Sequence, residues 1–141
     1  MSTLEPITVS VEVSCDPATA FAAFTEPASV MAWNFASPDW HCPHATNDVR
    51  VGGAFCYRME ARDGSMGFDF EGTFLDVEPG ALLRFGLGPE RVVTVEFTPV
   101  VGGTAVRETF TPEDEHPLEM QRAGWQAILD NYRAHADSRV H

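Results

Sequence analysis

Residues 33–55 read WNFASPDWHCPHATNDVRVGGAF, and residues 59–74 read MEARDGSMGFDFEGTF. The first segment opens as a loop rich in Trp, Phe, Pro and His, and the second alternates between aromatic and polar residues. Large apolar rings beside a sheet must either fill a core or line a cavity. Which of the two they do decides what this protein can bind.

Alternation of apolar with polar residues over residues 49–59, and again over residues 66–74, predicts two strands that each bury one face. Asp63-Gly64 between them is a strong hairpin signal. In such a hairpin we expect Arg58 to pair with a carboxylate of the second strand. The two strands therefore form an antiparallel pair with aromatic residues along one side.

On the N-terminal side, residues 7–13 alternate as a strand with one buried face. Asp16 is a good N-cap residue and Pro17 suits the first helical position, so a short helix is expected to follow. Thr25-Glu26-Pro27 resets the chain before a second short helix. Residues 34–47 are predicted to form an ordered loop.

On the C-terminal side, alternation over residues 83–85, 93–97 and 104–110 predicts three further strands separated by turns. After Thr111-Pro112 the apolar spacing becomes helical and continues to the C-terminal region. The stripe of this long helix comprises Trp125, Ile128, Leu129, Tyr132 and Ala136.

These elements predict a single α+β domain over residues 1–141, with a curved antiparallel sheet of six strands around the long C-terminal helix. An antiparallel sheet needs a cover on one face, and only the C-terminal helix is long enough to supply it. A curved sheet that grips one helix leaves space between them. We expect the two short helices and the 34–47 loop to close that space.

The 141 residues carry a net charge of −12, and all nine basic residues are Arg. An acidic surface repels phosphate backbones and anionic lipid, so neither nucleic acid nor a membrane surface is an expected partner. The lack of Lys excludes a Schiff-base lysine and a P-loop lysine.

Cys15, Cys42 and Cys56 are odd in number and widely spaced, which indicates free thiols in a reducing compartment. The N-terminal segment alternates and lacks the apolar run of a signal peptide, and no apolar stretch approaches the length that spans a membrane. We expect a cytoplasmic protein without a cofactor.

Six motifs give the chain a resemblance to the START-like (SRPBCC, Bet v 1-like) superfamily with its helix-grip fold. Within it, the chain is similar to the group named after the activator of Hsp90 ATPase, also described as polyketide-cyclase-like. The motifs are FAAFT at 21–25, WHCP at 40–43, DVRVGGAF at 48–55, FEGTFLDVEP at 70–79, VTVEFT at 93–98 and GWQAILDNY at 124–132.

The resemblance implies a hydrophobic cavity between the sheet and the long helix, and it implies homodimers. It does not imply a reaction, because one fold hosts many functions. The aromatic residues that we expect to contact a ligand there are Trp33, Trp40, Tyr57, Phe68, Phe70 and Trp125. Polar contacts are expected from His41, which follows Trp40 at the cavity mouth, and from Glu108.

Glu108 alternates with Val106 and Phe110, so the three residues should share one face. If that face is concave, burial would raise the pKa of the carboxyl and could make it a general acid or base. The alternatives are an ion pair with an Arg, or a shifted strand that places Glu108 in solvent.

His41, Cys42 and His44, with Asp39 and Asp48 nearby, are residue types that bind zinc. Their spacing matches no standard zinc pattern, so no metal site is expected and the histidines are interpreted as part of a structured loop. The cysteines lie in no recognisable Cys-His motif and are interpreted as small apolar residues.

Three functions are consistent with these residues. The first is binding of a small hydrophobic or aromatic molecule in the cavity. The second is an enzyme of cyclase, dehydratase or hydrolase type that uses the same cavity, with Glu108 or His41 as acid or base. The third is a module that interacts with an Hsp90-type chaperone, which the family name alone suggests.

Overall fold

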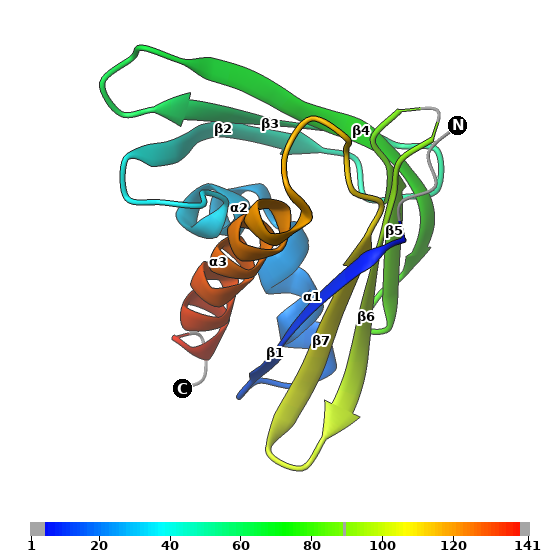
Figure 1. Cartoon of the computed structure of the whole chain (residues 1–141). Coiled ribbons are helices and arrows are strands. Elements are labelled where there is room, and N and C mark those ends of the chain that lie inside the picture. The colour runs from blue at the N-terminus through cyan, green and yellow to red at the C-terminus, as the bar shows by residue number, and fades with distance from the viewer. Residues whose placement is uncertain (1–4, 89, 139–141) are drawn as a thin grey trace.

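The computed structural model of the chain describes residues 5–88 and 90–138. Within them, seven strands form one antiparallel sheet in the order β1-β7-β6-β5-β4-β3-β2, which curls around the long helix (Figure 1). The elements are β1 (Ile7–Val13), α1 (Pro17–Thr25), α2 (Pro27–Trp33), β2 (Trp40–Asn47), β3 (Ala54–Ala61), β4 (Gly67–Glu78), β5 (Leu82–Gly86), β6 (Val92–Val100), β7 (Gly103–Phe110) and α3 (Leu118–Asp137). The α+β helix-grip fold expected from the sequence is confirmed.

The prediction of six strands was wrong, because residues 40–47 form the edge strand β2 and not a loop. β2 pairs with β3, and its register shifts between His41 and His44, on either side of Pro43. Proline cannot donate to a ladder and is tolerated at edge strands and bulges. The proline and the polar residues around it hid the alternation of this strand in the sequence.

The two short helices begin where the sequence predicted. The Asp16 carboxylate accepts a hydrogen bond from the Thr19 backbone N–H at 2.8 Å, and Pro17 is the first residue of α1. The Glu26 N–H still donates to the Ala22 carbonyl, while Pro27 already opens α2. The pair of helices therefore turns sharply and lies beside α3 (Figure 1).

Two predicted boundaries were displaced. β3 begins only at Ala54, because Gly52 adopts a positive φ of 85° and a Cβ on Gly53 would collide with the Asp48 carbonyl. The preceding Val51 is consequently exposed and takes no part in the strand. α3 begins at Leu118, several residues after the expected start, following Pro117.

The predicted cross-strand ion pair is present on the convex face. Arg58 lies opposite Asp69 in the β3–β4 register, and its Nη1 is 3.4 Å from the Asp69 carboxylate. Arg58 Nε also donates to Glu60 at 2.8 Å. These exposed groups leave the other face of the strands to the rings.

α3 is tied to the short helices by an aromatic cluster. The ring of Tyr132 lies 5.1 Å from Phe24 and 5.5 Å from Trp33, measured between centroids. Its hydroxyl donates to the Ala20 carbonyl at 2.7 Å, and the indole N–H of Trp33 donates to the Ala23 carbonyl at 2.9 Å.

Among the described residues, no helix is long and apolar enough to cross a membrane.

The hydrogen bond of Tyr132 gives a test of this packing. Tyr132→Phe keeps the ring and removes only the buried hydroxyl, so we expect the free energy of unfolding to fall by about 1 kcal/mol. Urea denaturation followed by circular dichroism should show a lower midpoint with an unchanged slope. An unchanged midpoint would mean that this bond contributes no net stability.

Candidate ligand-binding cavity

A cavity of about 180 Å³ lies between the concave face of the sheet and the helices. Its walls come from β3, β4, β5 and β7 on one side and from all three helices on the other. The lining residues are Phe24, Trp33, Asn34, Phe55, Tyr57, Met59, Phe68, Phe70, Phe74, Leu83, Phe85, Glu108, Trp125, Ile128 and Leu129. Apart from a few polar groups the surface is apolar and mostly aromatic.

Rings that pack on the sheet itself build the wall of the cavity. Phe55 is centred 5.0 Å from Tyr57, 5.3 Å from Phe74 and 5.1 Å from Phe85. The ring of Phe55 lies across Gly72, where a Cβ would come within 2.9 Å of it and would also collide with the Gly86 carbonyl. The missing side chain at Gly72 therefore allows the Phe55 ring to pack flat against the strand, so the ring does not fill the cavity.

Trp125 brings α3 onto the same wall. Its indole stacks on Phe110 with centroids 4.0 Å apart and planes at 11°, and it meets Phe70 edge-on at 6.2 Å. Offset and edge-to-face contacts of this kind add to the energy of simple burial. The walls are thus rigid, because each ring is fixed by neighbours on its own side.

Glu108 is the one charged residue among the described residues that line this apolar surface. It occupies the middle of β7, opposite Val9 of β1 and Val95 of β6, and is 6% exposed. Within the described residues its carboxyl group has no hydrogen-bond or ion-pair partner. Burial raises the pKa of Glu108 to about 8. Of the positions considered for Glu108, the one on the concave face is therefore correct, and its carboxyl group is largely a neutral acid at pH 7.

Two further polar side chains reach the cavity. The Tyr57 hydroxyl accepts a hydrogen bond of 3.0 Å from the Asn47 amide, which also donates to the Thr25 carbonyl at 2.6 Å. Burial raises the pKa of Tyr57 to about 12, so its proton remains in place at neutral pH. Asn34, just after α2, is buried, and its side-chain amide has no partner among the described residues.

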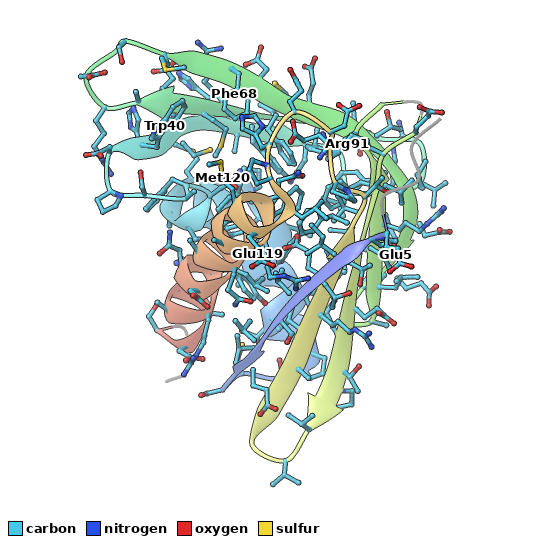
Figure 2. The ribbon with its side chains drawn as sticks, in the orientation of Figure 1. Glu5, Trp40, Phe68, Arg91, Glu119 and Met120 are labelled. Carbon is cyan, nitrogen blue, oxygen red and sulfur yellow. The ribbon has the colours of Figure 1, made fainter. Side chains whose placement is uncertain are left out.

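The cavity reaches the surface at Phe68, which lines it and is nevertheless 50% exposed. Trp40 of β2 lies against the outer side of this ring, with centroids 6.0 Å apart. Figure 2 shows both residues on the β2–β4 side of the molecule and Met120 at the start of α3. An entrance beside the exposed ring of Phe68 is suited to an apolar molecule.

Besides Glu108, five of the six aromatic residues predicted to contact a ligand lie on the cavity wall: Trp33, Tyr57, Phe68, Phe70 and Trp125. Trp40 is not part of the wall and touches it only through Phe68. His41 lies elsewhere, since it pairs with Glu60, and its Nε2 is 4.0 Å from that carboxylate on the convex face. We therefore leave His41 out of the proposed site.

Sequence reasoning missed part of the wall. Phe55, Phe74 and Phe85 share the inward face of their strands with Tyr57, so the alternation that predicted the strands could have identified them. Ile128 and Leu129 follow from the apolar stripe of α3 in the same way. Asn34 gave no signal, because its position depends on where α2 ends.

The residues considered for zinc do not converge. Cys42 is buried, its thiol donates to the His44 carbonyl at 3.4 Å, and burial raises its pKa to about 11. His44 points outward from the edge strand and is exposed. Among the described residues, these side chains do not form a group whose ligand atoms could share one metal ion, and a protonated, buried thiol is a poor nucleophile.

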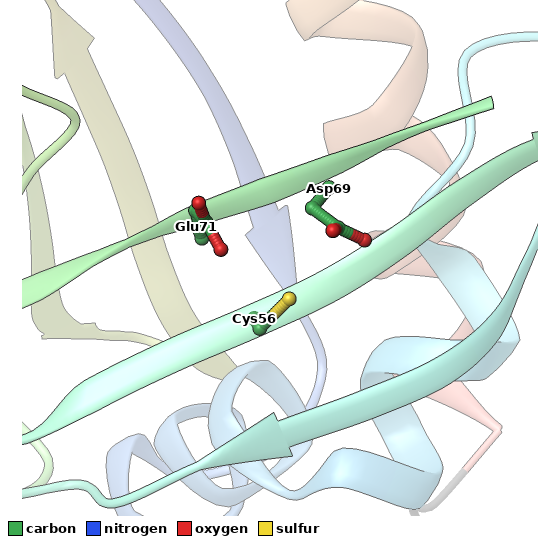
Figure 3. A group of neighbouring side chains, drawn as sticks. All are labelled: Cys56, Asp69 and Glu71. Atoms are coloured by element: carbon green, nitrogen blue, oxygen red, sulfur yellow. The ribbon is translucent and has the colours of Figure 1, made fainter.

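A different group of potential ligands lies on the convex face. The ligand atoms of Cys56, Asp69 and Glu71 lie within 4.8 Å of one another, as Figure 3 shows for their side chains. Burial and then the two carboxylates raise the pKa of the Cys56 thiol, so it stays protonated. Asp69 is also paired with Arg58. This arrangement is that of an ordinary charged sheet face.

The family model described as Activator of Hsp90 ATPase homolog 1-like protein matches residues 14–137. The chain belongs to this family. The motifs that predicted a START-like domain therefore identified the family correctly. Among curated proteins, none matches the chain.

Solved structures of relatives agree with the fold. The AHSA1-like protein from Aeromonas hydrophila is 40% identical over 95% of this chain and 93% of its own, with a TM-score of 0.89. A protein from Cytophaga hutchinsonii has the same identity and coverage, with a TM-score of 0.81. A Nitrosomonas europaea protein with 19% identity, which covers 98% of this chain and 97% of its own, has a TM-score of 0.80. This fold thus persists in a distant sequence.

The raised pKa of Glu108 predicts how the stability of this family member depends on pH. The unfolded chain releases this proton near the ordinary pKa of 4.5, whereas the folded chain holds it to about pH 8. Between these values the folded state binds more protons than the unfolded state. As the pH rises through this range, Glu108 alone therefore lowers the free energy of unfolding by up to about 1.4 kcal/mol per pH unit.

Glu108→Gln removes this effect. We expect the variant to be more stable than the wild type at pH 7.5, with the difference shrinking towards pH 4.5, as measured by urea denaturation across that range. Glu96→Gln, on the exposed face of β6, is the matched control and should leave the pH dependence unchanged. Parallel curves for the wild type and Glu108→Gln would contradict a buried, unpaired carboxyl.

Proposed function

We propose that the protein binds a small, largely apolar or aromatic molecule in the cavity between the sheet and α3. The observation that carries this proposal is an open volume of about 180 Å³ enclosed by aromatic rings. A well-packed core leaves few voids larger than a water molecule, and an apolar cavity of about 150 Å³ in another protein holds benzene. The space here suits a compound with one or two rings.

The polar groups on the wall support the same proposal. Small-molecule sites are mostly apolar with a few placed polar groups that fix orientation. Glu108 and Asn34 are buried, lie on the wall and lack partners among the described residues. Each would gain a hydrogen bond from a ligand that presents a donor or an acceptor at that point of the wall.

Acid–base catalysis in the same cavity is the second candidate. The pKa of Glu108, at about 8, lies near neutral pH, where a general acid or base works most efficiently. Catalysis would require a reacting group of the substrate within hydrogen-bonding reach of this carboxyl. Detection of a chemically altered product of the bound compound by mass spectrometry would favour an enzyme over a binding protein.

Two further expectations accompany the proposal. The family resemblance favours a homodimer, and light scattering of the purified protein gives the mass that tests it. Cys15, Cys42 and Cys56 form no disulfide with one another, which is compatible with a reducing, cytoplasmic location. The chaperone-interaction hypothesis rests on the family name and has no support from a particular described residue.

A cavity-filling variant tests the proposal. Ile128→Phe adds volume on the α3 wall of the cavity, so we expect it to weaken binding of 1-naphthylmethanol at least about tenfold, since the added ring takes the space of the ligand. Leu118→Phe, on the exposed side of the same helix, should bind like the wild type.

Binding is measured by the rise in melting temperature with ligand concentration. At a ligand concentration one hundred times the Kd, binding stabilises the folded state by about 2.7 kcal/mol. Native mass spectrometry of the purified protein would show in parallel whether a natural compound is retained. If 1-naphthylmethanol stabilises neither the wild type nor Leu118→Phe, the cavity is packing space and the proposal is wrong.

A further inference from the structure

We propose that the natural ligand is an apolar molecule with a single basic nitrogen, which Glu108 binds directly. This inference rests on the proposed function and adds the chemical class of the ligand. It starts from the position of Glu108 in the middle of β7, where β1 and β6 flank it on both sides. A side chain on the concave face of a strand that is paired on both sides cannot turn outward to reach water.

The cost of this placement indicates a missing partner. A buried carboxyl without a hydrogen bond costs stability, and groups of this kind in native proteins are nearly always satisfied. The partners of Glu108 in the neighbouring strands, Val9 and Val95, offer no polar side chain. The open cavity is the remaining direction from which a hydrogen-bonding group can arrive.

The charges of the cavity select the sign of that group. Among the described residues no Arg or His lines the wall, so an anionic ligand would bury its charge in this apolar cavity without any positive charge to offset it. The chain as a whole carries a net charge of −12, which raises the local concentration of cations and repels anions. Fatty acids and aromatic acids are therefore poor ligands for this cavity.

Aromatic walls provide the second attraction for an ammonium group. Phe110 lies two residues after Glu108 on the same face of β7, and Trp125 stacks on it at 4.0 Å. Phe70 makes an edge-to-face contact with the same indole. Trp125 and Phe70 line the cavity together with Glu108, so a cation bound there can also contact aromatic rings, which attract positive charge most strongly where water is excluded.

The proton balance of this interaction can be written explicitly. In the free protein near pH 7, Glu108 is mostly a neutral acid because burial raises its pKa to about 8. Binding of a protonated amine favours the carboxylate, so the Glu108 proton passes to the buffer while the ammonium keeps its own. Tyr57, the other titratable group on the wall, stays protonated throughout because its pKa is about 12.

Three compounds that share one ring system separate a cationic, a neutral and an anionic ligand: 1-naphthylmethylamine, 1-naphthylmethanol and the anion of 1-naphthaleneacetic acid (the acetate below). We expect the wild type at pH 7 to bind the amine about tenfold or more tighter than the alcohol, as a charged hydrogen bond allows, and the acetate weakest. Calorimetry in two buffers of different ionisation enthalpy should detect release of up to one proton with the amine and none with the alcohol.

Glu108→Gln should lose the preference for the amine over the alcohol, because its amide carries no negative charge to pair with the ammonium group. Glu96→Gln removes the same charge from the exposed face of β6 and should keep that preference, which separates the local carboxyl from the net charge of the protein. Circular dichroism of each variant establishes that it is folded before binding is compared.

The outcomes distinguish this inference from the function on which it rests. If the wild type binds the alcohol but gains nothing from the amine, or if the acetate binds tightest, the amine inference is wrong and the cavity proposal stands. If Glu108→Gln retains the full preference for the amine, the carboxyl is not the binding group. If none of the three compounds binds, both proposals are wrong.

Discussion

One helix has to cover the apolar concave face of a seven-stranded sheet, and this mismatch in width determines the rest of the molecule. The backbone of α3 lies closest to β1 at one edge of the sheet and to α1 and α2 at its side. Strands β3, β4 and β5, which lie towards the other edge of the sheet, are therefore too far from α3 for short side chains to bridge the distance. Rings on those strands fill part of the distance, and the cavity is the part that they leave.

The two short helices decide where the empty space ends. Trp33 and Phe24 pack against Tyr132 of α3, and the hydroxyl and indole groups of this cluster are satisfied by backbone carbonyls of α1. This end of the interior is consequently filled and rigid. The space opens instead towards Phe68, where the β3–β4 hairpin extends beyond the helix (Figure 2). An interior that is filled at one end and open at the other is typical of a binding site, whereas an ordinary hydrophobic core is filled throughout.

Much of this could be predicted from the sequence, and the failures have physical causes. Alternation, helical spacing and caps such as Asp16-Pro17 are local signals, and they placed the helices and all strands except β2. β2 was missed because Pro43 sits at a bulge, which depends on the pairing with β3. His41 was placed at the cavity for the same reason, since the face of a residue cannot be assigned in a segment whose strand is not recognised.

Glu108 shows what local patterns can and cannot decide. Its face followed from Val106 and Phe110, but its lack of a partner depends on β1, β6 and α3, which meet only in the folded chain. A sheet position of this kind normally holds Val or Ile, and replacing the carboxyl with either would remove both the desolvation cost and the pH dependence. The cavity borders this acid, so the pH dependence that we expect of the stability and the ligand preference that we propose both follow from one residue.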